Sequence, residues 1–141
     1  MDPLLKKMNF KEGMKIMLFE VPNEFQTLSH RWQSHSLSIE NNQSPDLILG
    51  FISSKKELEM LFPVMNTYVT SDQIFWLAYP KKSSKTYKTD ISRDSGWALL
   101  GEYDFEGVRQ VSLNEDWSAL RFRKIEFIKK MTRNFSLKDQ K

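Results

Sequence analysis

Short apolar runs recur along the chain and alternate with segments that have helical spacing. The runs are too short for independent helices and predict strands, which lie at residues 14–20, 36–39, 47–52, 74–79, 108–113 and 118–123. The run at 47–52 is almost wholly apolar, as expected for a strand that is buried on both faces. The pattern therefore predicts a sheet in which this strand is covered on both sides.

One predicted helix follows the apolar run at 47–52. Ser54 and Glu57 have the spacing of a capping box, in which the Ser54 hydroxyl accepts the Glu57 amide and the Glu57 carboxylate reaches back. Apolar residues then recur at positions 58, 61, 62 and 65, which gives the helix one apolar face. Pro63 has no backbone N–H and is expected to bend or end this helix.

Two more helices are predicted. Residues 21–28 fit a short helix with Pro22 in its first turn. Another begins near Asp90 and ends at Leu100, where Gly101 suits the left-handed position that follows a helix. The spacing of strands and helices favours βαβ units and a parallel sheet.

The end of the chain departs from this alternation. The last two strands are joined only by the short turn at 114–116, so they must be antiparallel neighbours or near-neighbours. We expect one domain over residues 1–133, followed by a basic polar tail over 134–141.

The composition describes a globular protein of 141 residues, with 40% hydrophobic and 28% charged residues. There is no cysteine, which excludes disulfides, thiolate nucleophiles and cysteine-ligated zinc. No apolar run approaches the length of about 20 residues that a membrane span needs. The N-terminus lacks the long apolar stretch of a signal peptide, so a cytoplasmic location is expected.

Positive charge is concentrated at the C-terminal end. The net charge is +3, yet residues 121–141 carry +6 and residues 1–120 carry −3. Apolar positions at 125, 128, 131 and 135 permit an amphipathic helix among these basic residues. Such a segment could dock on its own domain, pair with a second copy in a homodimer, or contact nucleic acid or an anionic membrane. A solvated end that aids solubility explains the same charges.

Five sequence runs together resemble a small, largely bacterial family that is known only as a domain of unknown function. They read GMKIML at 13–18, PDLIL at 45–49, WLAYPKKSS at 76–84, TDISRD at 89–94 and DWSALRF at 116–122. Members of that family look like shortened class I S-adenosylmethionine (SAM)-dependent methyltransferases. The resemblance implies a single Rossmann-like α/β domain of three layers, with a mostly parallel sheet of order 2-1-3-4-6-5 and an antiparallel last strand. It implies no established activity.

The chain departs from true methyltransferases at the turn after the first strand. Those enzymes have a glycine-rich turn there, because only glycine lets the backbone approach the cofactor closely. Here the turn reads EVPNEF over residues 20–25, and it contains no glycine. In the enzymes an acidic residue at the end of the second strand holds the ribose. Glu40 is placed for that role, although surface glutamates at strand ends are common. The turn argues against SAM, and no other cofactor is predicted.

The candidate ligand site lies at the carboxyl ends of the strands. Open α/β sheets bind ligands where the strand order reverses, which in the implied order falls between the first and third strands. The segments that end there supply Glu20, Asn23 and Ser53. The loop beyond the fourth strand adds Lys81, Lys82, Ser83, Ser84 and Lys85, which could hold a phosphate or carboxylate. A solvated basic loop is the competing explanation.

Other patterns carry less chemistry. Asp90 and Asp94 would share one helix face, where carboxylates mainly complement the helix dipole. His30 and His35 are the only histidines and have no nearby carboxylate cluster, so no metal site is predicted. The sequence has no nucleophile elbow, no Walker loop and no dinucleotide-binding fingerprint. No catalytic residue is predicted.

These patterns favour a non-enzymatic protein that binds an anionic small molecule or a protein partner at the carboxyl edge of its sheet. Two alternatives stay open. One is a divergent SAM-dependent methyltransferase with Glu20 and Glu40 near the cofactor, and the other is a nucleic-acid accessory protein that uses the basic C-terminal segment.

Overall fold

Five strands form one mixed sheet in the computed structural model, which describes residues 2–36 and 44–128. The strands are β1 (Ile16–Phe19), β2 (Leu47–Phe51), β3 (Ile74–Pro80), β4 (Phe105–Ser112) and β5 (Trp117–Lys124). They lie in the order β1-β2-β3-β5-β4. The first three are parallel, and β5 is antiparallel to both β3 and β4. The parallel beginning and the antiparallel last strand agree with the prediction from sequence.

The predicted strand at 36–39 falls almost wholly outside the described residues. Only Ser36 is described, and it forms an isolated parallel bridge with Ile16 of β1. The complete six-strand order therefore stays a prediction. Glu40 and the tail at 134–141 also lie outside the described residues.

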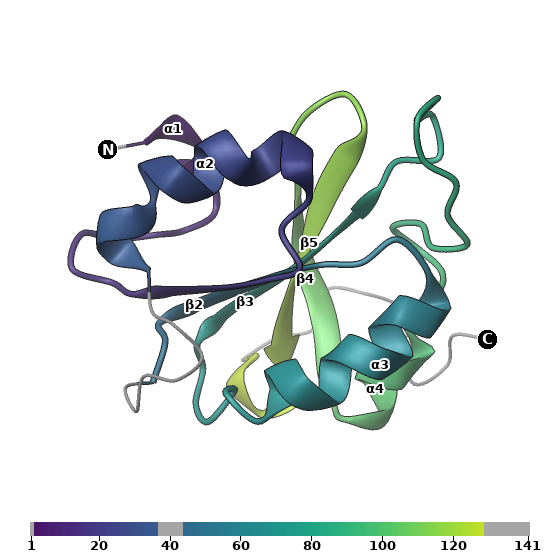
Figure 1. Cartoon of the computed structure of the whole chain (residues 1–141). Helices are drawn as coiled ribbons and strands as arrows, with labels where there is room; N and C mark the ends of the chain where they lie inside the picture. The colour runs from purple at the N-terminus through teal and green to yellow at the C-terminus, as the bar shows by residue number, and fades with distance from the viewer. Residues whose placement is uncertain (1, 37–43, 129–141) are drawn as a thin grey trace.

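Helical segments cover both sides of the sheet, which Figure 1 shows almost edge-on. On one side lie α1 (Pro3–Lys7) and α2 (Gln26–Arg31), and on the other lie α3 (Lys55–Asn66) and α4 (Ala98–Glu102). Three short 3₁₀ turns complete the described elements: η1 (Asn23–Phe25), η2 (Gln33–His35) and η3 (Ile125–Phe127).

Each face of the sheet has its own buried cluster. On the α3 and α4 side, Phe62 packs against Phe75 of the sheet, and Trp97 packs against Phe122. On the α1 and α2 side, Trp32 and Trp76 lie in the second cluster. The alternation of side chains along each strand feeds both clusters, which is why the central strands β2 and β3 are buried along their whole length.

The N-terminus of α3 carries the predicted cap in a modified form. The Glu57 amide donates to the Ser54 hydroxyl oxygen at 3.1 Å. The Glu57 carboxylate reaches back to the amide of Ser53, at 3.3 Å, one residue earlier than a standard capping box requires. Pro63 does not end the helix, contrary to one of the two expectations from the sequence, because α3 continues to Asn66. Pro63 has no N–H to donate to the backbone carbonyl four residues earlier. Pro63 is on the exposed side of the helix, so water can bond to that carbonyl instead.

The predicted helix from Asp90 to Leu100 is also wrong. Only Ala98–Glu102 is helical, and the segment before it is irregular. Short polar side chains there bond to backbone groups and compete with the helix, as when the Ile91 amide donates to the Thr89 hydroxyl at 3.1 Å. Asp90 instead accepts the Lys55 amide of α3 at 2.8 Å, so Asp90 and Asp94 do not share a helix face.

The end of α4 and the start of β4 both differ from the bounds predicted from the sequence. Helix α4 ends at Glu102, beyond the predicted end at Leu100, so Gly101 lies inside the helix. Asp104 takes the left-handed position, with φ of 65°. Strand β4 begins at Phe105, whereas the sequence predicted a start at residue 108. Gly107 therefore lies within the strand, next to a register shift. A Cβ on Gly107 would lie 3.1 Å from the end of the Leu120 side chain, which would have to shift slightly to accommodate it.

Asp2 joins α1 to α2 and provides a test of this packing. Its carboxylate accepts the Leu4 amide at 2.9 Å and the Trp32 indole N–H at 3.3 Å, and it pairs with Arg31. Partial burial alone would raise the pKa of Asp2, but the bonds from Arg31 and Trp32 outweigh it and hold the pKa below its usual value.

We expect Asp2→Ala to lower the free energy of unfolding by about 1–3 kcal/mol at neutral pH. Since the folded pKa of Asp2 is lowered, its contribution is present above the ordinary carboxyl pKa and disappears as the pH falls through the folded value. Urea unfolding of both proteins at neutral and acid pH measures the difference. If Asp2→Ala lowered the free energy of unfolding by the same amount at both pH values, this role would be contradicted.

Candidate anion-binding groove

The carboxyl ends of β1, β2 and β3 meet at one edge of the sheet, where β5 begins. The register places Pro80 opposite Trp117 and Tyr79 opposite Ser118. Because β4 runs in the same direction as β3, its last residue, Ser112, reaches the same edge. This edge is where open α/β sheets usually bind ligands.

Aromatic side chains occupy this edge on the α1 and α2 side. Phe25, which follows β1 after one turn, has its ring centroid 5.1 Å from that of Phe51 at the end of β2. The Trp117 ring lies 5.6 Å from Phe51 and 6.1 Å from Phe25, and all three residues are buried. Glu20 ends β1 with a left-handed φ of 56°. Side chains therefore fill the space beside the ends of β1 and β2.

A groove of about 400 Å³ opens at the same edge, close to Tyr79 and Ser118. We call it the edge groove. Its lining residues are Tyr79, Lys81, Lys82, Ser83, Ser92, Arg93, Gln110 and Ser118. Three of these side chains are cationic, and none of the eight is acidic. Several cations among lining residues that include no carboxylate suit an anionic ligand.

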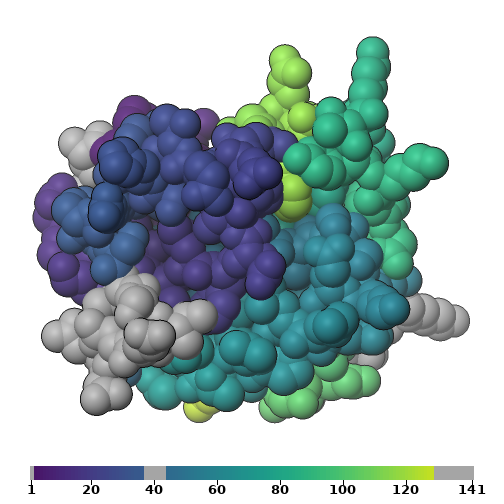
Figure 2. Space-filling view, viewed as in Figure 1, coloured from purple at the N-terminus to yellow at the C-terminus, as the bar shows by residue number. Residues whose placement is uncertain are grey.

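Hydrogen bonds hold the basic loop after β3 in place. The Lys81 amide donates to the Asp116 carbonyl at 2.7 Å, and the Ser84 hydroxyl donates to the Asp116 carboxylate at 2.7 Å. The same Ser84 oxygen accepts the Tyr87 amide at 3.0 Å. Tyr87 in turn donates to Glu24 of η1. Figure 2 shows this segment, green on the bar, projecting from the body beside the purple N-terminal part.

The cations of the edge groove are anchored but accessible. Lys81 donates to the Ser112 hydroxyl at 2.7 Å, and Lys82 donates to the Thr89 carbonyl at 2.9 Å. Arg93 pairs with its neighbour Asp94 at 3.3 Å, and both side chains are more than half exposed. Such exposed pairs are weak, so Arg93 can turn toward a bound anion at little cost.

Tyr79 has the most perturbed pKa at this site. Only 2% of the residue is exposed, and its hydroxyl has no hydrogen-bond partner among the described residues. Burial removes the phenolate from water and raises the pKa of Tyr79 to about 12. The hydroxyl is therefore a neutral donor across the physiological pH range.

This pKa can be measured directly. In an alkaline absorbance titration we expect Tyr79 to ionise near pH 12, well above an ordinary tyrosine. Since the folded pKa is raised, its effect on stability is absent below pH 10 and becomes destabilising as the unfolded phenol ionises. Tyr79→Phe should remove this late step, and a titration unchanged by that substitution would contradict the assignment.

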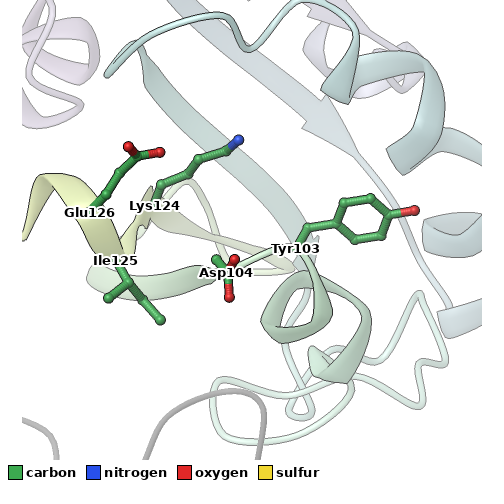
Figure 3. A pocket seen from close by; sticks show the side chains of 5 residues that line it. All are labelled: Tyr103, Asp104, Lys124, Ile125 and Glu126. Carbon is green, nitrogen blue, oxygen red and sulfur yellow. The ribbon is translucent and has the colours of Figure 1, made fainter.

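A second pocket, of about 390 Å³, lies at the opposite end of the sheet (Figure 3). It is lined by Tyr103, Asp104, Lys124, Ile125 and Glu126. Figure 3 shows these side chains coming from the end of α4 and from the end of β5. Its lining mixes one cation with two carboxylates, so it has no clear preference for anions.

The structure brings together only part of the site that was predicted from sequence. Lys81, Lys82 and Ser83 line the edge groove, whereas Glu20, Asn23, Ser53 and Ser84 are not among its lining residues. The Ser53 hydroxyl bonds to Glu57 of α3, and the Ser84 hydroxyl fixes the loop. Glu20 and Asn23 are exposed. Ligand contacts of all seven residues stay untested.

Five lining residues were not predicted from the sequence: Tyr79, Ser92, Arg93, Gln110 and Ser118. A signal was available in the sequence at Ser118, which is a polar residue between Trp117 and the apolar pair at 119–120. No comparable signal marks Gln110, which reaches the groove only through the pairing of β4 with β5.

Neither a metal-binding cluster nor a membrane-spanning helix is present among the described residues. No group of three or more histidine, aspartate or glutamate side chains there could hold a metal ion. Within the same residues, no helix has the length and apolar character needed to cross a membrane.

No protein-family model matches the chain, and no curated protein is detectably similar to it in sequence. Solved structures do share its fold. The m1A22 tRNA methyltransferase TrmK of B. subtilis is 8% identical with a TM-score of 0.52, and the match covers 87% of this chain and 65% of TrmK. This chain thus spans just under two thirds of TrmK.

Two further structures extend the comparison. An uncharacterised protein from Listeria monocytogenes is 10% identical with a TM-score of 0.53, covering 94% of this chain and 72% of that one. Sp1610 of Streptococcus pneumoniae, a putative tRNA (m1A22) methyltransferase, is 9% identical with a TM-score of 0.50, covering 88% of this chain and 70% of that one. The chain is a single α/β domain with a Rossmann-like, methyltransferase-like fold, and identities this low concern the fold alone.

Proposed function

We propose that this protein binds a small anionic molecule in the edge groove and does not catalyse methyl transfer. The observation that carries the proposal is the set of three cations, Lys81, Lys82 and Arg93, around a groove whose lining contains no carboxylate. The groove lies at the sheet edge that α/β proteins use for ligands. Its walls are held by hydrogen bonds to Asp116, so little ordering is needed on binding.

The residues at the end of β1 do not fit an adenosyl cofactor, which supports the second half of the proposal. A nucleoside would need close backbone approach at the turn, where this chain has Val21 and Pro22 and no glycine. The buried ring of Phe25 packs on Phe51 beside the same strand ends. Displacing these rings would expose apolar surface that the fold buries.

The likeness to TrmK favours a second candidate function, a divergent SAM-dependent methyltransferase. Glu20 lies at the end of β1, as such an enzyme would require, and Glu40 lies outside the described residues. Calorimetry with SAM and S-adenosylhomocysteine separates the two candidates. Binding of either nucleoside would support the enzyme, whereas the absence of heat at millimolar ligand would exclude it.

A thermal-shift and calorimetric screen of phosphorylated and carboxylated metabolites tests the main proposal. We expect at least one anion to bind, and we expect Lys81→Ala combined with Lys82→Ala to abolish that binding. Lys85→Ala combined with Lys88→Ala is the matched control, because it removes the same charge from nearby residues that do not line the groove. Equal loss in both double variants would discard the site.

Nucleic-acid binding through the basic C-terminal segment stays a prediction, since residues 129–141 lie outside the described part of the chain. The measurement that bears on it is binding to generic DNA and RNA at several salt concentrations. Affinity that falls steeply with salt and vanishes on truncation after Lys124 would support such a role.

A further inference from the structure

One residue that lines the edge groove has a buried hydroxyl without a hydrogen-bond partner among the described residues. The Tyr79 hydroxyl forms no hydrogen bond among the described residues, although only 2% of the residue is exposed and it lines the groove. Buried side-chain donors in native structures almost always have a protein, water or ligand partner. The Tyr79 ring also packs on Trp97, with ring centroids 5.3 Å apart.

The donors around the groove belong to separate segments of the chain. Tyr79 and Ser118 lie on paired strands at the floor, Lys81 and Lys82 come from the loop after β3, and Arg93 comes from the segment before α4. A carboxylate is planar, has two oxygens and carries one charge. A phosphoryl group carries close to two charges and has three strong acceptor oxygens that point in three directions. The number and spread of donors match the phosphoryl group better.

We propose that the edge groove holds the phosphoryl group of a phosphate monoester, and that the Tyr79 hydroxyl donates a hydrogen bond to one of its oxygens. This inference rests on the proposed function and adds the ligand class and the binding residue. The raised pKa of Tyr79 keeps the phenol protonated, as a donor must be.

The size of the groove favours an ester over the free ion. Its volume of about 400 Å³ falls in the range of roughly 300–1,000 Å³ that is typical of small-molecule sites. Inorganic phosphate and an ester share the same head group, so an experiment must compare them.

The test is isothermal titration calorimetry of the full chain at low ionic strength. Inorganic phosphate, glycerol phosphate and acetate are each titrated into the wild type, Tyr79→Phe and Tyr103→Phe. Tyr103→Phe is the matched control, because it removes the hydroxyl of a tyrosine at the other end of the sheet, away from the edge groove. Urea unfolding of each variant shows whether it is folded. Tyr79→Phe is expected to be at least as stable as the wild type, since it removes a hydroxyl that has no partner.

We expect glycerol phosphate to bind more tightly than inorganic phosphate and at least about tenfold more tightly than acetate. Tyr79→Phe should weaken both phosphates by about tenfold or more, the usual effect of losing a hydrogen bond to a charged group. Tyr103→Phe should leave all affinities unchanged.

The outcomes separate this inference from the proposed function. If Tyr79→Phe binds phosphate as well as the wild type does, the hydroxyl holds only water and the inference is overturned while anion binding stands. If acetate binds as tightly as the phosphates, the ligand class is wrong and anion binding again stands. If inorganic phosphate binds as tightly as the ester, the ligand is the free ion. If the wild type binds none of the probes, both this inference and the proposed function of anion binding are overturned.

Discussion

Replacing Trp97 by alanine is expected to lower the free energy of unfolding by about 3–5 kcal/mol, the usual cost of removing a fully buried large aromatic side chain. Trp97 has no exposed surface, and its ring lies 5.3 Å from Tyr79 and 5.0 Å from Phe122. Its indole N–H donates to the Ser92 carbonyl at 2.7 Å, which fixes the irregular segment before α4. Equilibrium unfolding in urea measures the loss.

Trp97→Phe provides the matched control, because it keeps an aromatic ring and loses the bond to Ser92. It should cost less than the alanine variant. Since Ser92 and Arg93 line the edge groove, both variants should also weaken anion binding. A loss of stability below about 1 kcal/mol in Trp97→Ala would contradict the packing described for this cluster.

Reversing the charge of Lys82 and Arg93 together is expected to reduce the affinity for an anionic ligand by at least about a hundredfold, because each substitution removes an attraction and adds a repulsion. Both side chains are exposed, so the fold should be retained. Lys82→Glu combined with Arg93→Glu is titrated with glycerol phosphate in a calorimeter at low salt. Added salt should narrow the difference from the wild type.

The control for charge reversal is Lys85→Glu combined with Lys88→Glu. These lysines belong to the same segment of chain and carry the same charge, but they do not line the edge groove. The control should lose only the small part of the affinity that comes from long-range attraction. Equal losses in the two double variants would mean that net charge, rather than the groove, governs binding.

The strands could be predicted from sequence because apolar runs such as 47–52 leave few other structures for so short a segment. The helix predicted at Asp90 could not, since its failure depends on a partner distant in the chain. Asp90 caps α3 through the Lys55 amide, and Gly96 takes a left-handed φ of 98°. Local propensity disfavours a helix at Gly96, but it gives no indication of the contact between Asp90 and Lys55.

The same distinction holds for the candidate site. The basic loop could be found from sequence because Lys81, Lys82 and Ser83 are adjacent in the chain and follow a predicted strand. The floor of the groove could not, because Tyr79 meets Ser118 only through the register of β3 and β5. A one-residue shift of that register would have turned a different set of side chains toward the groove.

Amide NMR spectra of the labelled full chain, titrated in parallel with inorganic phosphate and with S-adenosylhomocysteine, distinguish the two ligand positions residue by residue. We expect phosphate to shift the amide signals of Ser83, Ser92 and Ser118 around the edge groove, and we expect the nucleoside to shift none near Val21 and Phe25. Nucleoside-dependent shifts at Val21 and Phe25, with no response to phosphate at the three serines, would contradict both the filled strand ends and the anion site.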